Sequence, residues 1–408
     1  MGRRVIRALL LVLLAAIATI QLQALVMSLR PPEAYFKDFS QEYLLARALW
    51  DGVDTNLPIR TLAERYVIAT GYLDKDNPTP HPPTAGLFAL PFALTSYVSA
   101  DAAWFILQLV CLVASVALLG RGAGLGLRPP HVAFVSFLLV GWPPVVLELG
   151  LGQSTLPLLT LLAAAQLALL TGRSKLAGLL LGVGLLLKPL AWPWLLVLAH
   201  RRDWAALATT AVTMLIGYAL VAAREGPERL GNYFFHVLPE WNAGFLHEPT
   251  NASLVAVGQR LFTDQPLLAQ VVSLALIAAV LVLVWWSAAP SRPITLALGV
   301  ATAASIMIGP VAWAYYPVLA LLPIANAVSL LRKRRHLPTA VALTAVMVVP
   351  YFNGILVRAT QTTAFVVTLS VSVCTLLLAL ATERGYAQSG DQLLVAGHAD
   401  RGLAGDHV

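Results

Sequence analysis

Two carboxylates four residues apart stand out in a strongly apolar chain. Asp38 and Glu42 lie in the stretch KDFSQEY, which ends at Tyr43 and follows the first long hydrophobic run. On a helix, residues i and i+4 share one face and lie about 6 Å apart along the axis. A carboxylate at the edge of a low-dielectric region binds its proton more tightly, which suits a general base. The same spacing also fits an interfacial helix with a solvated acidic face, so spacing alone leaves both interpretations open.

Lys188 is the basic residue that most needs an explanation. It follows the apolar run LAGLLLGVGLLL and begins the sequence KPLAWPW. Counted from Lys175, it lies roughly 20 Å into a hydrocarbon core of about 30 Å, where an ammonium needs a carboxylate or a lipid phosphate as partner. The prolines indicate a broken helix, which is tolerated at that depth where it lines a cavity. The alternative is a side chain that snorkels to the outer surface.

Four further segments carry polar or aromatic side chains near helix ends. They are HPPTAGLFALPFAL with His81, ELGLGQSTLP with Glu148 and Gln153, EPTNASL with Asn251, and GPVAWAYYP with Tyr315 and Tyr316. Three of them have a structural alternative: a re-entry turn for the histidine, an ordinary loop for the glutamate and an aromatic belt for the tyrosines. No Cys/His cluster has the spacing of metal ligands, so neither a metal nor another cofactor is predicted.

The composition places the chain among polytopic membrane proteins. Of its 408 residues, 58% are hydrophobic and only 12% are charged, about half the charged fraction of a soluble domain. The net charge of +7 comes without a basic patch or a nucleic-acid-binding motif, so nucleic acid is not an expected partner. Cys111 and Cys374 both lie in apolar runs and are predicted to be small core residues.

The hydrophobic runs predict an all-α protein with about twelve transmembrane helices. The expected spans are residues 5–28, 102–120, 131–147, 155–171, 175–188, 189–200, 204–223, 266–287, 293–309, 311–331, 337–350 and 362–382. The stretch 175–200 is either one broken span or two short ones. Arginine and lysine concentrate in alternate short loops, most clearly in RKRRH at 332–336, which predicts that both termini are cytoplasmic.

The predicted organisation is a single membrane domain, residues 1–384, followed by a disordered cytoplasmic tail, residues 385–408. Two long segments, 29–101 and 224–265, fall outside the membrane, and the first has the apolar spacing of amphipathic interfacial helices. The candidate acids, bases and phosphate partners all fall on this outer side. This grouping indicates chemistry on a lipid-linked phosphate in the outer leaflet.

The order of several motifs resembles the GT-C glycosyltransferases that use polyprenyl-phosphate sugars, and more narrowly glycosyltransferase family 87. The motifs run in order over most of residues 5–331: DFSQEYLLARALWDGVD, HPPTAGLFALPFAL, the block from GQSTLP to LLLKPLAWPW, NASL, and AYYPVLALLP. The block that contains Lys188 is the most specific of them.

The resemblance implies a GT-C fold and a bacterial plasma-membrane enzyme that transfers a sugar, mannose first and arabinofuranose second, from a polyprenyl-phosphate donor to a glycolipid or polysaccharide acceptor. The family's acidic residue after the first span falls on Asp38, which is expected to be the general base of an inverting displacement. Lys188, Tyr315 and Tyr316 are expected to bind the donor phosphate. The remaining expected substrate contacts are Glu42, Tyr43, His81, Gln153 and Asn251.

Departures from the family pattern leave the sugar open. Lys37 stands where the arabinosyltransferase branch has a second acid, and His81 stands where mannosyltransferases have a tyrosine. The sequence Trp313-Ala314-Tyr315-Tyr316 replaces their Trp-x-His-His. The main alternative function is a multi-pass transporter or flippase of lipid-linked sugars. Inverted repeats with matching broken helices would favour it, and KPLAWPW is the one convincing break.

Overall fold

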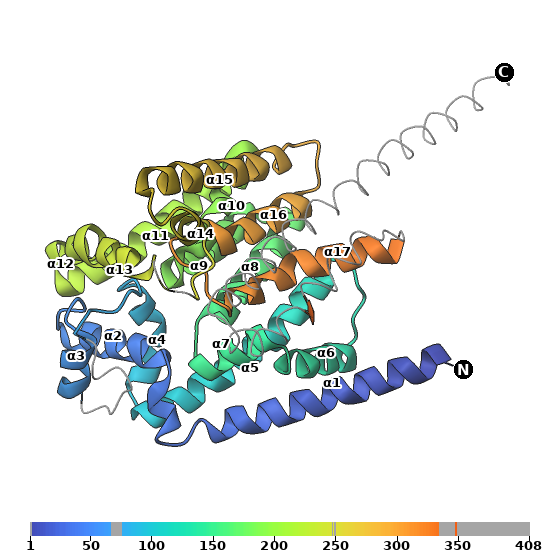
Figure 1. Ribbon diagram of the computed structural model, residues 1–408, viewed down its shortest axis with the longest axis horizontal. Helices are drawn as coiled ribbons and strands as arrows, with labels where there is room; N and C mark the ends of the chain where they lie inside the picture. The colour runs from blue at the N-terminus through green and yellow to red at the C-terminus, as the bar shows by residue number, and fades with distance from the viewer. Residues whose placement is uncertain (1, 67–75, 247, 249, 334–346, 349–408) are drawn as a thin grey trace.

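The computed structural model describes residues 2–66, 76–246, 248, 250–333 and 347–348, and every regular element in those ranges is helical (Figure 1). The prediction of an all-α protein is confirmed for this part of the chain. The expected spans at 337–350 and 362–382 and the tail 385–408 lie outside the described residues, apart from residues 347 and 348.

Four helices are long and apolar enough to cross a bilayer: α1 (Gly2–Met27), α5 (Tyr97–Gly122), α11 (Trp204–Glu225) and α15 (Pro266–Ser287). The shorter two have 22 residues each, or about 33 Å at 1.5 Å per residue, enough for a core of roughly 30 Å. The chain is therefore a multi-pass membrane protein.

The expected total of about twelve spans is not reached among the described residues. Helices α6 (Pro129–Val140) and α7 (Pro143–Leu151) form a pair bent by 79°, which makes at most a fifth span. The other apolar helices are too short to cross a bilayer. They are α8 (Thr155–Leu170), α9 (Ser174–Leu187), α10 (Pro193–His200), α16 (Ile294–Met307) and α17 (Leu321–Lys333). Fourteen helical residues extend only about 21 Å. Hydropathy alone does not distinguish a span from a short buried helix.

The stretch 175–200 is broken at Lys188. Helix α9 ends at Leu187, and Lys188 has an extended backbone with φ −155° and ψ 110°. The turn η2 (Pro189–Ala191) separates it from α10, because Pro189 and Pro193 cannot supply the amide hydrogens that a continuous helix needs. The interpretation of KPLAWPW as a helix break is confirmed.

The short helices pack through small residues and buried polar contacts. At Gly178 in α9, an added Cβ would overlap the backbone carbonyl of Ala206 in α11. Thr210 Oγ1 donates to Gly178 O at 3.0 Å across the same contact. In α10, Trp194 Nε1 donates to Thr302 Oγ1 of α16 at 3.0 Å. Close approach at a glycine, with polar groups satisfied between helices, is typical of membrane packing.

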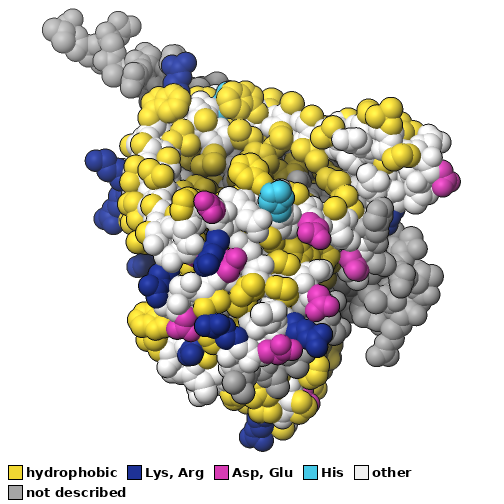
Figure 2. Space-filling model, turned by 90° about the vertical axis from the view of Figure 1, so that its left-hand side faces the viewer, with side chains coloured by type: hydrophobic (Ala, Val, Ile, Leu, Met, Phe, Trp, Pro, Cys, Tyr) yellow, Lys and Arg dark blue, Asp and Glu magenta, His cyan; other side chains and the backbone are white. Residues whose placement is uncertain are grey.

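The two long segments predicted to lie outside the membrane meet at one end of the molecule, on the left in Figure 1. The first forms α2 (Phe39–Asp51), α3 (Ile59–Arg65) and α4 (Ala85–Ala93), and the second forms α12 (Pro227–Asn232), α13 (Leu238–Phe245) and α14 (Leu254–Leu261). Thr55 Oγ1 donates to Glu225 at 2.7 Å, and Asn56 Nδ2 donates to Arg229 O at 2.8 Å. Figure 2 views this end directly and shows acidic and basic side chains interspersed over its lower half.

Helix α2 differs from the expected surface helix, because nearly its whole length is buried. It packs against α4, where a Cβ on Gly86 would lie only 3.0 Å from the backbone of Leu45. Glu42 is 1% exposed. The alternative of a solvated acidic face on this helix is therefore wrong.

Candidate functional site

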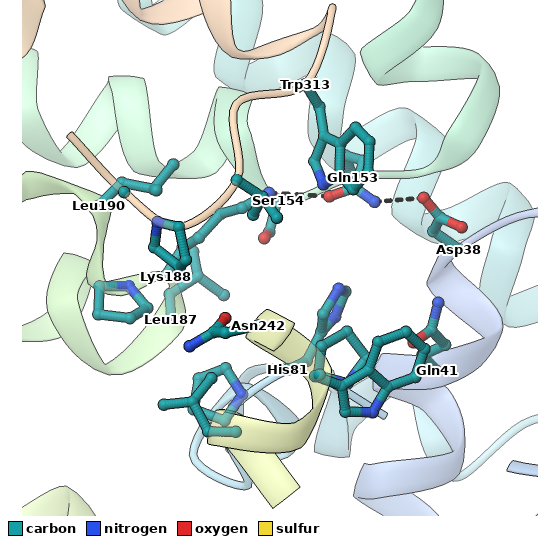
Figure 3. Close-up of a pocket in the computed structure, with 18 of the residues that line it drawn as sticks. Asp38, Gln41, His81, Gln153, Ser154, Leu187, Lys188, Leu190, Asn242 and Trp313 are labelled. Carbon is teal, nitrogen blue, oxygen red and sulfur yellow. Dashed lines mark hydrogen bonds between the residues drawn. The ribbon is translucent and has the colours of Figure 1, made fainter. Parts of the chain in front are cut away.

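A cavity of ≈ 640 Å³ lies where the two outer segments meet the short membrane helices (Figure 3). Its walls come from the start of α2, the segment before α4, the turn after α7, the break at Lys188, helix α13 and the segment before η4 (Tyr316–Ala320). Its lining includes Asp38, His81, Gln153, Lys188, Tyr315 and Tyr316. Residues far apart in the sequence are thus brought together around one space.

Asp38 is the first aspartate after α1, and it stands immediately before α2. Its Oδ2 accepts a hydrogen bond from Gln153 Nε2 at 2.5 Å. The preceding residue, Lys37, forms a buried ion pair with Asp101 at 2.9 Å, with both side chains at most 3% exposed. This pair ties the chain at residue 37 to α5 and thereby fixes the position from which the Asp38 carboxylate enters the cavity.

Gln153 follows a glycine turn at the end of α7. Gly152 has a φ of +69°, a left-handed conformation that favours glycine. Trp104 Nε1 donates to Gly152 O at 2.8 Å, and Gln108 Nε2 donates to Gln153 O at 2.7 Å. Helix α5 therefore holds the backbone of this turn, which fixes the position from which the Gln153 side chain extends.

Lys188 reaches into the cavity opposite Asp38. Its Nζ donates to Gln153 Oε1 at 2.8 Å and lies 3.3 Å from Thr155 Oγ1. The same ammonium lies 5.0 Å from the ring centroids of both Tyr315 and Tyr316, a cation–π arrangement. The residue is only 9% exposed, so the snorkelling alternative is wrong.

Lys188 has the anionic neighbours that a buried ammonium requires. The carboxylates of Glu148, Glu42 and Asp38 all act electrostatically on its ammonium. Glu148 is fully buried, and its Oε1 accepts a hydrogen bond from Leu156 N at 2.7 Å in the first turn of α8. Glu148 does not line the cavity. Its buried carboxylate balances the positive charge of Lys188 from the protein interior.

Glu42 and His81 form a second polar pair beside the cavity. His81 Nδ1 lies 2.8 Å from Glu42 Oε1. The histidine side chain is 18% exposed and lines the cavity, whereas the glutamate side chain behind it is 1% exposed. Glu42 therefore contacts the cavity through His81 and not directly.

Two of the expected substrate contacts are placed elsewhere. Tyr43 donates to Thr95 O at 2.7 Å and packs edge-on against Tyr97, away from the cavity. Burial raises the pKa of its hydroxyl, which keeps the hydrogen on this bond. Asn251 donates to Phe245 O and Pro310 O, and its Oδ1 accepts from two backbone amides, so it anchors the segment before Trp313.

Several lining residues were not predicted from the sequence, and they are Gln41, Ser154, Tyr218, Phe234, Trp241 and Asn242. Gln41 is part of KDFSQEY and follows Asp38 by three residues, so a helix-face argument would have found it. The others depend on how the second outer segment folds back over the first. Over the described ranges, no three His, Cys, Asp or Glu side chains gather where they could hold a metal ion.

Comparison with known protein families shows a match over much of the chain. The model of glycosyltransferase family 87 matches residues 80–310, which is more than half of the chain and includes His81, Gln153 and Lys188. No curated protein matches the chain. Because the match begins after Asp38, it does not bear on the role of that residue. The chain belongs to glycosyltransferase family 87 and is therefore a membrane-embedded sugar transferase.

Proposed function

We propose that the protein transfers a sugar from a polyprenyl-phosphate donor to a hydroxyl of a glycolipid or polysaccharide acceptor, with the GT-C fold and inversion at the sugar. The observation that supports this most is the hydrogen-bonded series Asp38–Gln153–Lys188, which places a carboxylate and an ammonium on opposite sides of one cavity (Figure 3). A displacement at a sugar phosphate needs a base at the attacking oxygen and a positive charge at the leaving group.

The reaction follows from these two positions. Asp38 takes the proton of the acceptor hydroxyl while that oxygen attacks the anomeric carbon. The bond from that carbon to the phosphate oxygen breaks, and its electron pair stays on the phosphate. Lys188 stabilises the charge that develops there. The products are the glycosylated acceptor, the polyprenyl phosphate and a proton on Asp38.

The Lys188 site suits a phosphate because its polar contacts are exchangeable. A phosphate oxygen can take the place of Gln153 Oε1 at the ammonium, while Thr155 Oγ1 remains beside it at 3.3 Å. The faces of Tyr315 and Tyr316 hold the ammonium from the other side. A lysine binds phosphate as a point charge and needs no second basic group.

Large apolar side chains line much of the rest of the cavity, as a lipid-linked donor requires. Leu187, Leu190, Trp192, Phe245 and Trp313 line it near the phosphate position. The polyprenyl chain comes from the bilayer, whose hydrocarbon is as apolar as these side chains, so the cavity can accept the chain without exposing it to water. We assign the cavity to the outer face of the bacterial plasma membrane, with both termini cytoplasmic, since the basic loops predict that orientation.

The test is direct transfer by the purified protein in liposomes. Radiolabelled polyprenyl-phosphate mannose and polyprenyl-phosphate arabinofuranose are supplied separately, with octyl glycosides as acceptors, and labelled disaccharide is counted. Mannose is the favoured sugar and arabinofuranose the second. Movement of labelled lipid between leaflets without sugar transfer from either donor would support the flippase alternative and contradict the proposal.

A further inference from the structure

The segment that carries His81 is fastened from several directions. Trp241 Nε1 donates to Pro78 O at 2.5 Å, and Tyr233 donates to Pro80 O at 2.8 Å. Thr79 Oγ1 donates to Gln41 at 2.8 Å and accepts from the backbone amide of His81 at 3.2 Å. Two prolines follow the histidine. A turn that merely connects two helices does not need bonds from three other elements, so this one holds its side chain in a fixed place.

The imidazole of His81 is oriented by Glu42. Among the described residues, the buried Glu42 carboxylate accepts no hydrogen bond of regular geometry, and its close polar contact is His81 Nδ1 at 2.8 Å. A buried carboxylate without a donor is costly, which favours the tautomer with the hydrogen on Nδ1, next to Glu42, and in that tautomer Nε2 is a hydrogen-bond acceptor. The opposite edge of the ring, with Nε2, then faces the cavity that His81 lines. Figure 3 shows this side chain directed into the cavity, with Asp38 and Lys188 on opposite sides of it.

We propose that Nε2 of His81, oriented by Glu42, accepts a hydrogen bond from a second hydroxyl of the acceptor sugar and thereby selects and orients the acceptor. This inference rests on the proposed function and deepens it. Glu42 follows Asp38 by one helical turn, so Glu42 and His81 stand on the α2 side of the cavity, next to the base. Lys188 and the two tyrosines stand on the other side, where the donor phosphate binds.

Sugar geometry supports an acceptor that spans these two groups. Neighbouring ring carbons of a pyranose or furanose both carry hydroxyls, so one ring can present the attacking hydroxyl to Asp38 and a second hydroxyl to His81. A site that is built to hydrogen-bond a hydroxyl also rejects sugars that lack it, because the buried polar group is then left unpaired. His81 is therefore a specificity-determining residue, and Glu42 is the residue that positions it.

The test measures binding to each half of the cavity by tryptophan fluorescence, because Trp241 and Trp313 both line it. The probes are octyl mannoside and octyl arabinofuranoside for the acceptor half and polyprenyl phosphate for the donor half. The variants are His81→Phe, which removes Nε2 while keeping a ring, and His81→Gln, which restores an acceptor atom. His236→Phe is the matched control, since this exposed histidine does not line the cavity.

His81→Phe should weaken glycoside binding about 10- to 100-fold, the effect of one lost hydrogen bond to a buried group, and change polyprenyl phosphate binding less than about twofold. His81→Gln should recover part of the glycoside binding, Lys188→Ala should show the opposite pattern, and His236→Phe should match the unmodified protein. Unchanged glycoside binding in His81→Phe, or no glycoside response in the unmodified protein, overturns the inference. If the unmodified protein does not bind polyprenyl phosphate, that result would instead contradict the proposed donor.

Discussion

Replacing Gln153 with leucine tests whether the base and the phosphate site depend on the amide between them. Leucine has nearly the same volume, so the side chain fills the same space without either hydrogen bond. The change removes the 2.5 Å bond to Asp38 and the 2.8 Å bond from Lys188. Lys188 keeps its contact with Thr155 at 3.3 Å and with the two tyrosine rings, so the ammonium is not left alone.

The expected loss follows from the charged partners. A hydrogen bond to a charged group contributes about 1.5–3 kcal/mol. Loss of one such contribution in the transition state lowers kcat/KM by about 10- to 150-fold at 1.36 kcal/mol per tenfold. Because the donor phosphate takes the place of Gln153 Oε1 at Lys188, whereas the bond from Gln153 to Asp38 stays, we expect kcat to fall and the donor KM not to rise. Initial rates with the radiolabelled donor, at varied donor and fixed octyl glycoside, separate the two effects.

A matched control is present on the neighbouring helix. Gln166 in α8 is equally buried, but it exchanges 3.3 Å hydrogen bonds with Asn326 of α17 and does not line the cavity. Gln166→Leu should retain full transfer activity and lose only a little thermal stability. Transfer by Gln153→Leu within about twofold of the unmodified protein, or an equal loss in both variants, would refute the coupling of Asp38 to Lys188 through this amide.

Two further predictions concern the elements that position the site. Asp101→Asn should lower the free energy of unfolding by about 3–5 kcal/mol, because Lys37 loses the opposite charge that it is buried with; an unfolding midpoint in detergent that equals the unmodified protein would contradict this. Gly178→Ala should destabilise the α9–α11 contact by about 1–3 kcal/mol, since the new methyl group meets a backbone carbonyl. Gly150→Ala is its control, because the nearest atom there lies at an ordinary contact distance of 3.5 Å, and equal midpoints for the two alanine variants would count against the packing argument.

Residue type and position in the sequence predicted several of the side chains that line the cavity, but not the number of spans. A lysine far inside an apolar run has few explanations, so Lys188 could be identified with its helix break and its need for carboxylate neighbours. Asp38, His81 and Gln153 were likewise found from their positions at helix ends. The number of spans was not predictable in the same way, because short helices such as α9 and α16 are as apolar as the long ones.

Tyr43 and Asn251 do not line the cavity, and the physical reason is the same for both. Each side chain makes its hydrogen bonds with backbone groups. Whether a polar side chain faces substrate or ties a loop depends on which carbonyls the fold brings within reach. That Trp241 and Asn242 line the cavity could not be predicted from the sequence either, since it requires the segment 224–265 to fold over the segment 29–101.

The most direct test of the central claim compares the unmodified protein with Asp38→Asn in the liposome transfer assay. Asparagine keeps the shape of the side chain but cannot take the acceptor proton, so transfer should fall about 100- to 10,000-fold, the usual contribution of a general base. Polyprenyl phosphate binding, followed by tryptophan fluorescence, should stay within about twofold because Lys188 is untouched. Full transfer activity in Asp38→Asn would contradict the assignment of this carboxylate as the base.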